Sequence, residues 1–521
     1  MNTRRLLFIL ALTAFAMLLN AQDADSLDVS IVLDASDSMD GGLLTSAKNA
    51  SNQFIQQLEV GDEVAVSAYS NHAHTYYQMN LITSITQLNA VTSAVNTIET
   101  DLYTSIGAGM IRGLLEMNDI VSVNPIVGMI LLSDGLENVV PMVSQVIGGV
   151  PGIVDIHTVG YGSDCDQGLM VAIANATGGS YHYAETTGIT QIVQDIWADL
   201  ICGDVNMARW GVIGANRPAT VMHPVTIHRG MGEVMFNLCW SNSDANLGLR
   251  LVAPDGTVYD PAHLLPADIE YRLWPTQAFF RFDNPQEGQW SALIDPVGAL
   301  EVSEDYFFTV SGKSDLNLSL NFDHPIYQIG DAVGVMADLT YCGNSISDAQ
   351  ITAVVERTDG SSIEFPLTAS QFVGEGRGQY FGSFIAQYDD SYTVRLYAQG
   401  STSDGAFTRT RGRSTYVGSI PQFDAVAPGL LQLSAENYPN PFNPSTTISF
   451  NIPAEAPVTL EIYNVRGQHV RTLVNETLPA GTHQAVWNGD DANGAPVASG
   501  IYFFKIGSGR YTATKKMILL K

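Results

Sequence analysis

Basic residues are scarce in this 521-residue chain: 24 Lys and Arg stand against 53 Asp and Glu, a formal net charge of −29 at pH 7. A surface this acidic repels the phosphate backbone of nucleic acids and anionic lipid headgroups. We therefore expect neither nucleic acid nor direct membrane adsorption. The acidity attracts cations, but a diffuse excess of carboxylates does not by itself form a metal site.

Motifs that identify common enzyme classes are also missing. The sequence has no HExxH zinc-protease motif, no GxSxG nucleophile elbow and no GxxxxGK[ST] phosphate loop. Carboxylates abound, but no pair is marked out as a catalytic acid and base. We therefore expect a protein that is not an enzyme.

Cysteine is rare as well, with four residues and no CxxC spacing that argues for zinc. In an exported chain these cysteines could form disulfides, and four of them allow three complete pairings. Buried or unpaired thiols are the alternative, and the sequence leaves both open. The four are Cys165, Cys202, Cys239 and Cys342.

Long apolar runs are absent except at the start of the chain. Arg4 and Arg5 precede an apolar run from Leu6 to Leu19, and a small residue, Ala21, follows at a plausible cleavage point. This is the pattern of a signal peptide over residues 1–21. A membrane-spanning helix needs roughly 20 apolar residues, so we expect no transmembrane anchor. The sequence predicts an exported protein.

The length predicts roughly three or four domains. Over residues 26–202, short apolar runs alternate with segments of helical periodicity, which predicts a doubly wound α/β domain with a mostly parallel sheet. After Cys202 the helical periodicity vanishes and short alternating strands follow. We expect three all-β units of sandwich or immunoglobulin-like type, the first two serving as a stalk. Their ranges are 205–320, 321–420 and 435–521, with a linker at 421–434.

The expected elements of the α/β domain follow from these patterns. Strands are expected at 27–33, 63–69, 125–132, 153–159 and 179–183, and helices around 47–58 and at 105–117, 167–176 and 190–200.

One polar cluster is predicted at the carboxyl edge of this sheet. The first strand delivers Asp34 to its end, and Ser36 and Ser38 follow at alternate positions. The strand that ends at Leu132 is followed by Asp134, and Thr104 opens a helix between the two strands, as a cap or a ligand. Strand ends of a parallel sheet meet at one edge. Carboxylates with hydroxyls form an oxygen-only set, which suits a hard cation such as Mg²⁺ or Ca²⁺.

These segments resemble the von Willebrand factor A family and its metal-ion-dependent adhesion site. The resemblance implies that Asp34, Ser36, Ser38, Thr104 and Asp134 hold a divalent cation, Mg²⁺ first, with Ca²⁺ or Mn²⁺ possible. It implies that the hydroxyls contact the metal, that at least one aspartate acts through water, and that a partner's carboxylate completes the shell. The family often has glycines just before the threonine, where this chain has Leu102 and Tyr103.

Two lesser signals have plainer explanations. His72 and His74 would share one face of a strand, but no third ligand is evident, so surface histidines are favoured over a metal site. Asp164 and Asp166 precede a helix, which favours a capping role over metal binding.

The C-terminal unit begins with the segment YPNPFNPST at 438–446 and ends in a basic strand. From Glu436 onward there are 7 basic and 6 acidic residues, so almost all of the net charge lies upstream. This unit resembles the C-terminal sorting domain of the bacterial type IX secretion system. The resemblance implies passage through the outer membrane by that machinery, and a location at the cell surface.

Together these observations predict a secreted surface protein that binds a protein or glycan ligand through a divalent metal. Two alternatives stay open: a surface hydrolase with its catalytic residues in the β-domains, and a structural component of a surface layer.

Overall fold

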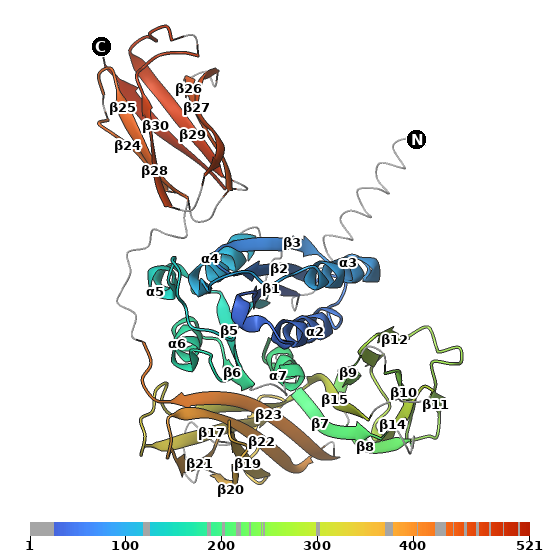
Figure 1. Cartoon of the computed structure of the whole chain (residues 1–521). Coiled ribbons are helices and arrows are strands. Elements are labelled where there is room, and N and C mark those ends of the chain that lie inside the picture. Colours follow the sequence, from blue (N-terminus) through green and yellow to red (C-terminus); the bar gives the residue numbers. More distant parts are fainter. Residues whose placement is uncertain are drawn as a thin grey trace, which may run out of the picture.

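The computed structural model describes most of the chain from Ser26 onward (Figure 1). The described residues are 26–117, 126–184, 189–200, 204–214, 220–228, 231–240, 242, 245–298, 303–369, 379–403, 405–421, 434–440, 442–452, 456–464, 468–478, 481–492, 494–508 and 511–520. The predicted signal peptide and most of the predicted linker lie outside these residues. No helix within the described ranges is long and apolar enough to cross a membrane.

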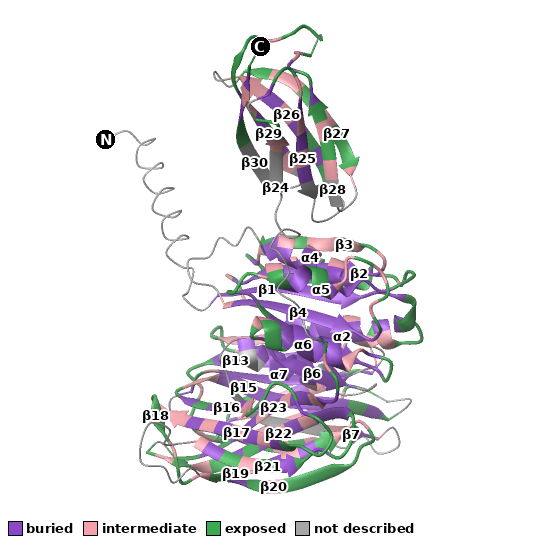
Figure 2. Ribbon diagram, turned by 90° about the vertical axis from the view of Figure 1, so that its left-hand side faces the viewer, coloured by how far each residue is buried: buried purple, intermediate pink, exposed green. Residues whose placement is uncertain are grey.

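The first domain is built on a six-stranded sheet in the order β3-β2-β1-β4-β5-β6. Its strands pair in parallel except β3, which runs antiparallel to β2. Every residue of the central strand β1 is buried, as expected for a strand covered on both faces (Figure 2). The predicted doubly wound α/β fold is confirmed. The strands are β1 (Leu27–Asp34), β2 (Glu63–Tyr69), β3 (Ala73–Leu81), β4 (Ile126–Ser133), β5 (Asp155–Tyr161) and β6 (Tyr181–Ala184).

Helices cover both faces of this sheet and create two apolar cores. One core includes residues from α2, α3 and α7, and the other includes residues from α4, α5 and α6. The helices are α2 (Leu43–Ile55), α3 (Ile85–Asn96), α4 (Ile106–Glu116), α5 (Val143–Val146), α6 (Gln167–Thr177) and α7 (Ile189–Leu200).

Strand β3 and helices α3 and α5 are missing from the sequence-based expectation. Strand β3 lies at the sheet edge with only Met79 buried, so it carries no apolar run. Helix α3 did carry a signal, because its buried residues Leu88, Val91 and Val95 recur at helical spacing.

Two β-sandwiches follow, each around its own core. Their sheets are joined by one pair of residues, Val205 in β7 and Thr410 in β23. The strands of the first are β7 (Asp204–Ile213), β8 (Val221–Ile227), β9 (Met231–Trp240), β10 (Leu247–Val252), β11 (Val258–Tyr259), β12 (Ile269–Trp274), β13 (Gln277–Asp283), β14 (Gly288–Pro296) and β15 (Glu304–Ser314). Those of the second are β16 (Leu316–Phe322), β17 (Ala332–Tyr341), β18 (Asn344–Ser345), β19 (Gln350–Arg357), β20 (Ser362–Ala369), β21 (Gln379–Ile385), β22 (Asp390–Thr402) and β23 (Gly405–Val417).

The boundary between the sandwiches lies earlier than the predicted position at residue 320. Leu316, Leu318 and Leu320 of β16 belong to the second core. Only Asp315 separates β15 from β16. Two alternating strands in direct succession leave no change of composition that could mark this boundary in the sequence.

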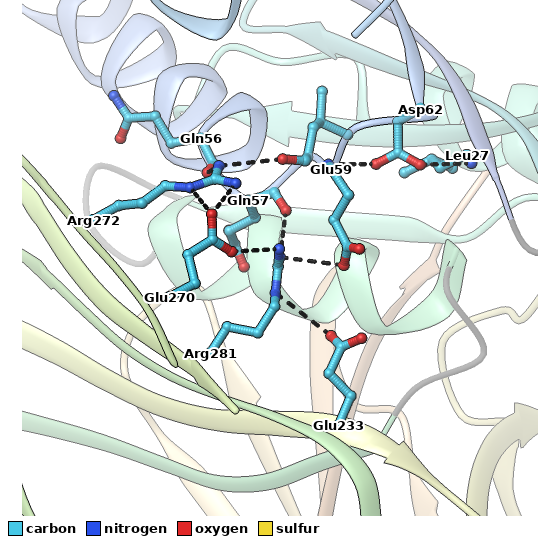
Figure 3. Close-up of polar contacts among 10 residues, drawn as sticks. Leu27, Gln56, Gln57, Glu59, Asp62, Glu233, Glu270, Arg272 and Arg281 are labelled. Carbon is cyan, nitrogen blue, oxygen red and sulfur yellow. Dashed lines mark hydrogen bonds and ion pairs between the residues drawn. The ribbon is translucent and has the colours of Figure 1, made fainter. Parts of the chain in front are cut away.

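The sandwiches are not a stalk beneath the first domain, because both pack against it. Arg272 and Arg281 of the first sandwich donate to the backbone at the end of α2 (Figure 3). The contacts are Arg272 Nη1 to Gln56 O at 3.1 Å and Arg281 Nη2 to Gln57 O at 2.8 Å. Carbonyls at the last turn of a helix lack intrahelical partners and carry partial negative charge, so a pair of guanidinium groups is favoured there.

The second sandwich also contacts the first domain. Arg395 on β22 makes two hydrogen bonds to Asp195 on α7, at 3.1 and 2.8 Å, in a largely buried ion pair. At the end of β23 and just beyond it the chain returns to the first domain, where Tyr416 and Ile420 pack against the core that includes α6. Gly168 on α6 permits this return, because a Cβ there would lie 2.8 Å from the carbonyl oxygen of Ser419.

The C-terminal unit is a smaller sandwich with its own core. The segment that opens this unit is hydrogen-bonded to its last strand. Asn440 accepts a hydrogen bond from Ile518 N at 2.9 Å and donates to Lys516 O at 3.1 Å. Phe442 packs beside Trp487, with ring centroids 5.5 Å apart. The strands are β24 (Ser434–Tyr438), β25 (Thr446–Ile452), β26 (Ala456–Asn464), β27 (His469–Leu478), β28 (Gly481–Trp487), β29 (Gly500–Ser508) and β30 (Tyr511–Leu519).

The described cysteines are all free thiols. Cys165 and Cys239 are buried, and Cys342 is exposed. Cys202 lies outside the described residues, so its pairing stays open.

Candidate metal centre

The first and third segments of the predicted site come from neighbouring strands. Asp34 is the last residue of β1, and Asp134 follows the last residue of β4. The two strands are parallel, with Leu33 opposite Leu132. Both carboxylates therefore leave the sheet at the same edge, because parallel strands that are paired in register end together.

The two serine hydroxyls lie between these two carboxylates, and each donates a hydrogen bond to one of them. Ser36 Oγ donates to Asp34 Oδ1 at 2.6 Å, and the hydroxyls of Ser36 and Ser38 lie 3.0 Å apart. Ser38 Oγ in turn donates to Asp134 Oδ1 at 2.7 Å, across 96 positions of sequence. Four of the five predicted ligands are thus gathered in one contact network.

Thr104 lies near the same cluster, and Gly135 shows its position relative to Ser38. A Cβ on Gly135 would lie 3.1 Å from Ser38 Oγ and 3.4 Å from Thr104 Oγ1, so both hydroxyls flank one point. The sequence left open whether Thr104 caps the following helix. The N-cap of α4 is Ser105, whose Oγ accepts from Ala108 N. The Thr104 hydroxyl is therefore not used as that cap.

Two residues that the sequence analysis gave no role hold Asp34 in place. Ser133 Oγ and Tyr69 OH donate to Asp34 Oδ2 at 2.7 and 3.2 Å. With the Ser36 amide and hydroxyl on Oδ1, this buried carboxylate accepts four hydrogen bonds. Asp34 thus orients Ser36 and is itself fixed. The signal for Tyr69 was its place at the end of β2, directly opposite Asp34.

Burial disfavours the ionised form of both carboxylates at this edge. Desolvation is the main cause that raises the pKa of Asp34, and the hydrogen bonds from Ser36, Ser133 and Tyr69 partly offset it. Desolvation also raises the pKa of Asp134 to about 6; the Ser38 hydrogen bond lowers it and the charge of Asp34 adds to the rise. A cation held here would relieve both effects, because it favours the ionised forms.

The donor set fits a hard divalent cation. Asp34, Ser36, Thr104 and Asp134 are buried and Ser38 is exposed, so the cluster opens to solvent at Ser38. All donors are oxygens, the ligands that Mg²⁺ and Ca²⁺ prefer. Within the described ranges there is no group of three or more His, Cys, Asp or Glu placed to hold a metal. A metal at this edge therefore depends on hydroxyls.

Backbone strain lies next to this cluster. Tyr103 has φ 61°, in the left-handed region. A bulky residue there costs of order 1–3 kcal/mol, whereas glycine adopts the conformation freely. This explains why glycine suits the position before the threonine, and it means that this chain keeps a tyrosine at a cost in stability.

The structure also shows the roles of the aspartates and histidines that the sequence marked as lesser signals. Asp166 is the N-cap of α6 and accepts from Leu169 N at 2.9 Å, whereas Asp164 contacts Ser163 Oγ and is not the cap residue. His72 and His74 are both exposed and form part of no metal-ligand group in the described structure.

Gly135→Ala is expected to weaken Mg²⁺ binding about tenfold, the lower end of the losses seen when groups around a metal site are disturbed. The added methyl would crowd the hydroxyls of Ser38 and Thr104. Isothermal titration calorimetry on the full chain measures the effect. Gly152→Ala is the matched control, because a Cβ there meets nothing within 4 Å. Equal affinity in the two variants would show that the space beside Gly135 is not used.

Comparison with known proteins identifies two segments. The family model described as von Willebrand factor type A domain matches residues 28–196, and the model described as FlgD Ig-like domain matches residues 440–510. A search of curated proteins found no match.

Several solved structures match part of the chain. A von Willebrand factor type A protein from Catenulispora acidiphila has 17% identity, covering 61% of this chain and 65% of that one, with a TM-score of 0.31. Proximal thread matrix protein 1 from the mussel byssus, with a zinc-occupied MIDAS motif, has 18% identity over 34% and 46%, TM-score 0.30. BatB from Bacteroides thetaiotaomicron, a conserved hypothetical protein, has 17% identity over 33% and 98%, TM-score 0.28. The chain spans less than two thirds of the length of the first three structures.

Proposed function

We propose that the von Willebrand factor type A domain at residues 28–196 binds a divalent cation, Mg²⁺ first, and through it a protein or glycan partner. Asp34, Ser36, Ser38, Thr104 and Asp134 would hold the cation. A domain of this family indicates a role in protein interaction or adhesion. The single observation that carries the proposal is the hydrogen bond from Ser38 Oγ to Asp134 Oδ1, at 2.7 Å, which brings two distant loops into one oxygen cluster.

The chemistry of this cluster favours a partner that supplies a carboxylate. Three of the five proposed metal ligands are neutral hydroxyls. Both carboxylate oxygens of Asp34 accept hydrogen bonds, four in all. A cation held by such a set keeps part of its positive charge. An anionic oxygen from outside then completes the coordination shell at the exposed side beside Ser38.

Two further parts of the proposal concern delivery. Residues 1–21 would direct export, and residues 435–521 would serve as a sorting domain for the type IX secretion machinery, which places the protein at the bacterial cell surface. The support is the motif at 438–446 and the near-neutral tail. We also propose a binding role and not an enzymatic one, because the gathered donors suit a resident cation and its partner.

The proposal is tested by titrating MgCl₂ into the full chain after treatment with EDTA and dialysis. Calorimetry should detect one saturable site, with Mn²⁺ and Ca²⁺ competing for it. Addition of excess EDTA should release the metal and leave the far-ultraviolet circular dichroism unchanged, because two apolar cores hold the sheet and helices of the domain together. Absence of a saturable site for all three cations would refute the proposal.

A further inference from the structure

Large apolar side chains stand exposed on the two loops that carry Thr104 and Asp134. Leu102 and Tyr103 are 53% and 57% exposed, and Leu136 and Val140 are 62% and 65% exposed. Single exposed apolar residues are ordinary on protein surfaces, but a group beside a binding site marks an interaction surface. We call these four residues the apolar rim.

The apolar rim has a fixed backbone frame. Thr104 N donates to Asn138 Oδ1 at 2.9 Å, and Asn138 N donates to Thr104 O at 2.9 Å. Ser105 Oγ also donates to Pro141 O at 3.1 Å. The loop before Thr104 and the loop after Asp134 are thereby tied together, so their exposed side chains belong to one face next to the metal ligands.

Tyr103 is the residue of the apolar rim whose conformation most needs an explanation. Its left-handed backbone is strained, and its side chain is more than half exposed, so packing within the chain does little to offset the strain. A strained conformation retained at an exposed position is typical of a functional surface. A partner that covers the ring would supply the missing compensation.

The acidic residues near the cluster gather where α2 begins and after α3 ends, and these two helices pack on the sheet face opposite α4 and α5. A hollow of about 420 Å³ lies there, formed by the loop after Ser38 with the start of α2 and by the segment before Asp101. Across residues 36–48 and 98–101 the charged side chains are Asp37, Asp40, Glu99 and Asp101, against the single cation Lys48. The rim segments 102–105 and 135–141 contain one charged residue, Glu137, and it accepts two backbone hydrogen bonds.

We propose that the partner is a protein segment in which an acidic side chain lies between apolar residues on one side and basic residues on the other. The inference rests on the proposed function, because the acidic side chain completes the metal shell. The apolar flank covers the apolar rim, and the basic flank faces the acidic hollow. Branched aliphatic side chains such as Leu136 and Val140 favour apolar amino acids over the hydroxyl-rich surface of a glycan.

Synthetic peptides test this arrangement against the full chain. The probe is a fluorescent peptide with a central Asp, a Leu-Phe flank and a Lys-Arg flank, made in both chain directions. Fluorescence polarisation in MgCl₂ should show saturable binding for one direction. Replacing the central Asp by Asn, the apolar flank by Ser-Ser, or the basic flank by Glu-Glu should each weaken binding about tenfold, and EDTA should abolish it.

Variants of the chain locate the contact. Tyr103→Gly and Leu136→Ser should each weaken binding of the complete peptide about tenfold while Mg²⁺ affinity stays unchanged. Tyr103→Gly should not lower the melting temperature, because it relieves the strained φ. Val258→Ser and Leu264→Ser are the matched controls, since both replace exposed apolar residues of the first sandwich, 54% and 101% exposed, and neither should change binding.

The outcomes separate the two proposals. Mg²⁺ binding without any preference among the peptides, or metal-dependent binding of a neutral polysaccharide alone, would overturn the partner and leave the metal site standing. Loss of peptide binding in the control variants as well as the rim variants would also overturn it. Absence of Mg²⁺ binding in the unmodified chain would refute the proposed function and this inference with it.

Discussion

Asp134→Ala is expected to lower the affinity for Mg²⁺ by at least about 100-fold, because loss of mere outer-shell partners already costs 10–100-fold at metal sites. The substitution removes one of the two carboxylates of the cluster and frees the Ser38 hydroxyl that donates to it. Calorimetric titration of the full chain measures the loss. Metal-dependent ligand binding should disappear with it, while the β-domains stay folded.

A matched control separates this loss from the effect of net charge. Asp348→Ala removes an equally charged residue from an exposed position in the second sandwich, and it should leave Mg²⁺ affinity unchanged. An Asp134→Ala variant that still bound Mg²⁺ as tightly as Asp348→Ala would rule out this residue as a ligand.

Asp34→Ala is also expected to abolish metal binding, but it is a less clean test. Alanine would leave the hydroxyls of Ser36 and Ser133 without this acceptor in a buried place, whereas Tyr69 OH keeps the carbonyl oxygen of Leu132. Each buried donor left without a partner costs about 1–3 kcal/mol. The free energy of unfolding would therefore fall together with metal affinity, and the two effects could not be told apart in one measurement.

Asp195→Ala is expected to destabilise the docking of the first domain on the second sandwich by about 3–5 kcal/mol, the usual loss when one partner of a buried ion pair is removed. It would leave the guanidinium of Arg395 in a largely buried place without the carboxylate that accepts its two hydrogen bonds. Scanning calorimetry should show the transition of that domain lowered by roughly 10 °C.

A double substitution checks the cause. Asp195→Ala combined with Arg395→Met removes both charges and keeps an apolar side chain of similar length. Replacing a whole buried pair by apolar groups is often neutral, so the double variant should recover most of the lost stability. A double variant that is as unstable as Asp195→Ala alone would show that the ion pair is not the source of the effect.

The sequence predicted the first domain and the gathering of its polar residues well, for a physical reason. Alternation of buried strands with amphipathic helices identifies a parallel sheet, and the ends of adjacent strands must meet, so Asp34 and Asp134 could be placed together before any coordinates. The family model over residues 28–196 confirms the von Willebrand factor type A prediction. The assignment of the individual metal ligands, the export signal and the sorting role stay predictions.

Other features depend on contacts that no local pattern encodes. Ser133 and Tyr69 were recognisable only as strand ends, and their hydrogen bonds to Asp34 follow from the register of three strands. The pairing of Asp195 with Arg395, 200 positions apart, requires two domains to dock. The prediction that the first two β-units form a stalk was also wrong. Strand periodicity indicates the type of a domain, but it does not indicate what the domain packs against.

The return of the chain to the first domain at the end of β23 has a mechanical consequence. A pull between a bound partner and the tail would first be borne by the contacts of Tyr416 and Ile420 with that domain, before it loads the rest of the two sandwiches. Only after those contacts yield would tension enter the chain between Asp204 and Thr415. If the sandwiches then unravelled, they would release on the order of 700 Å of slack, at about 3.4 Å for each extended residue. The two sandwiches would thus allow the protein to lengthen under load once the contacts of Tyr416 and Ile420 have broken.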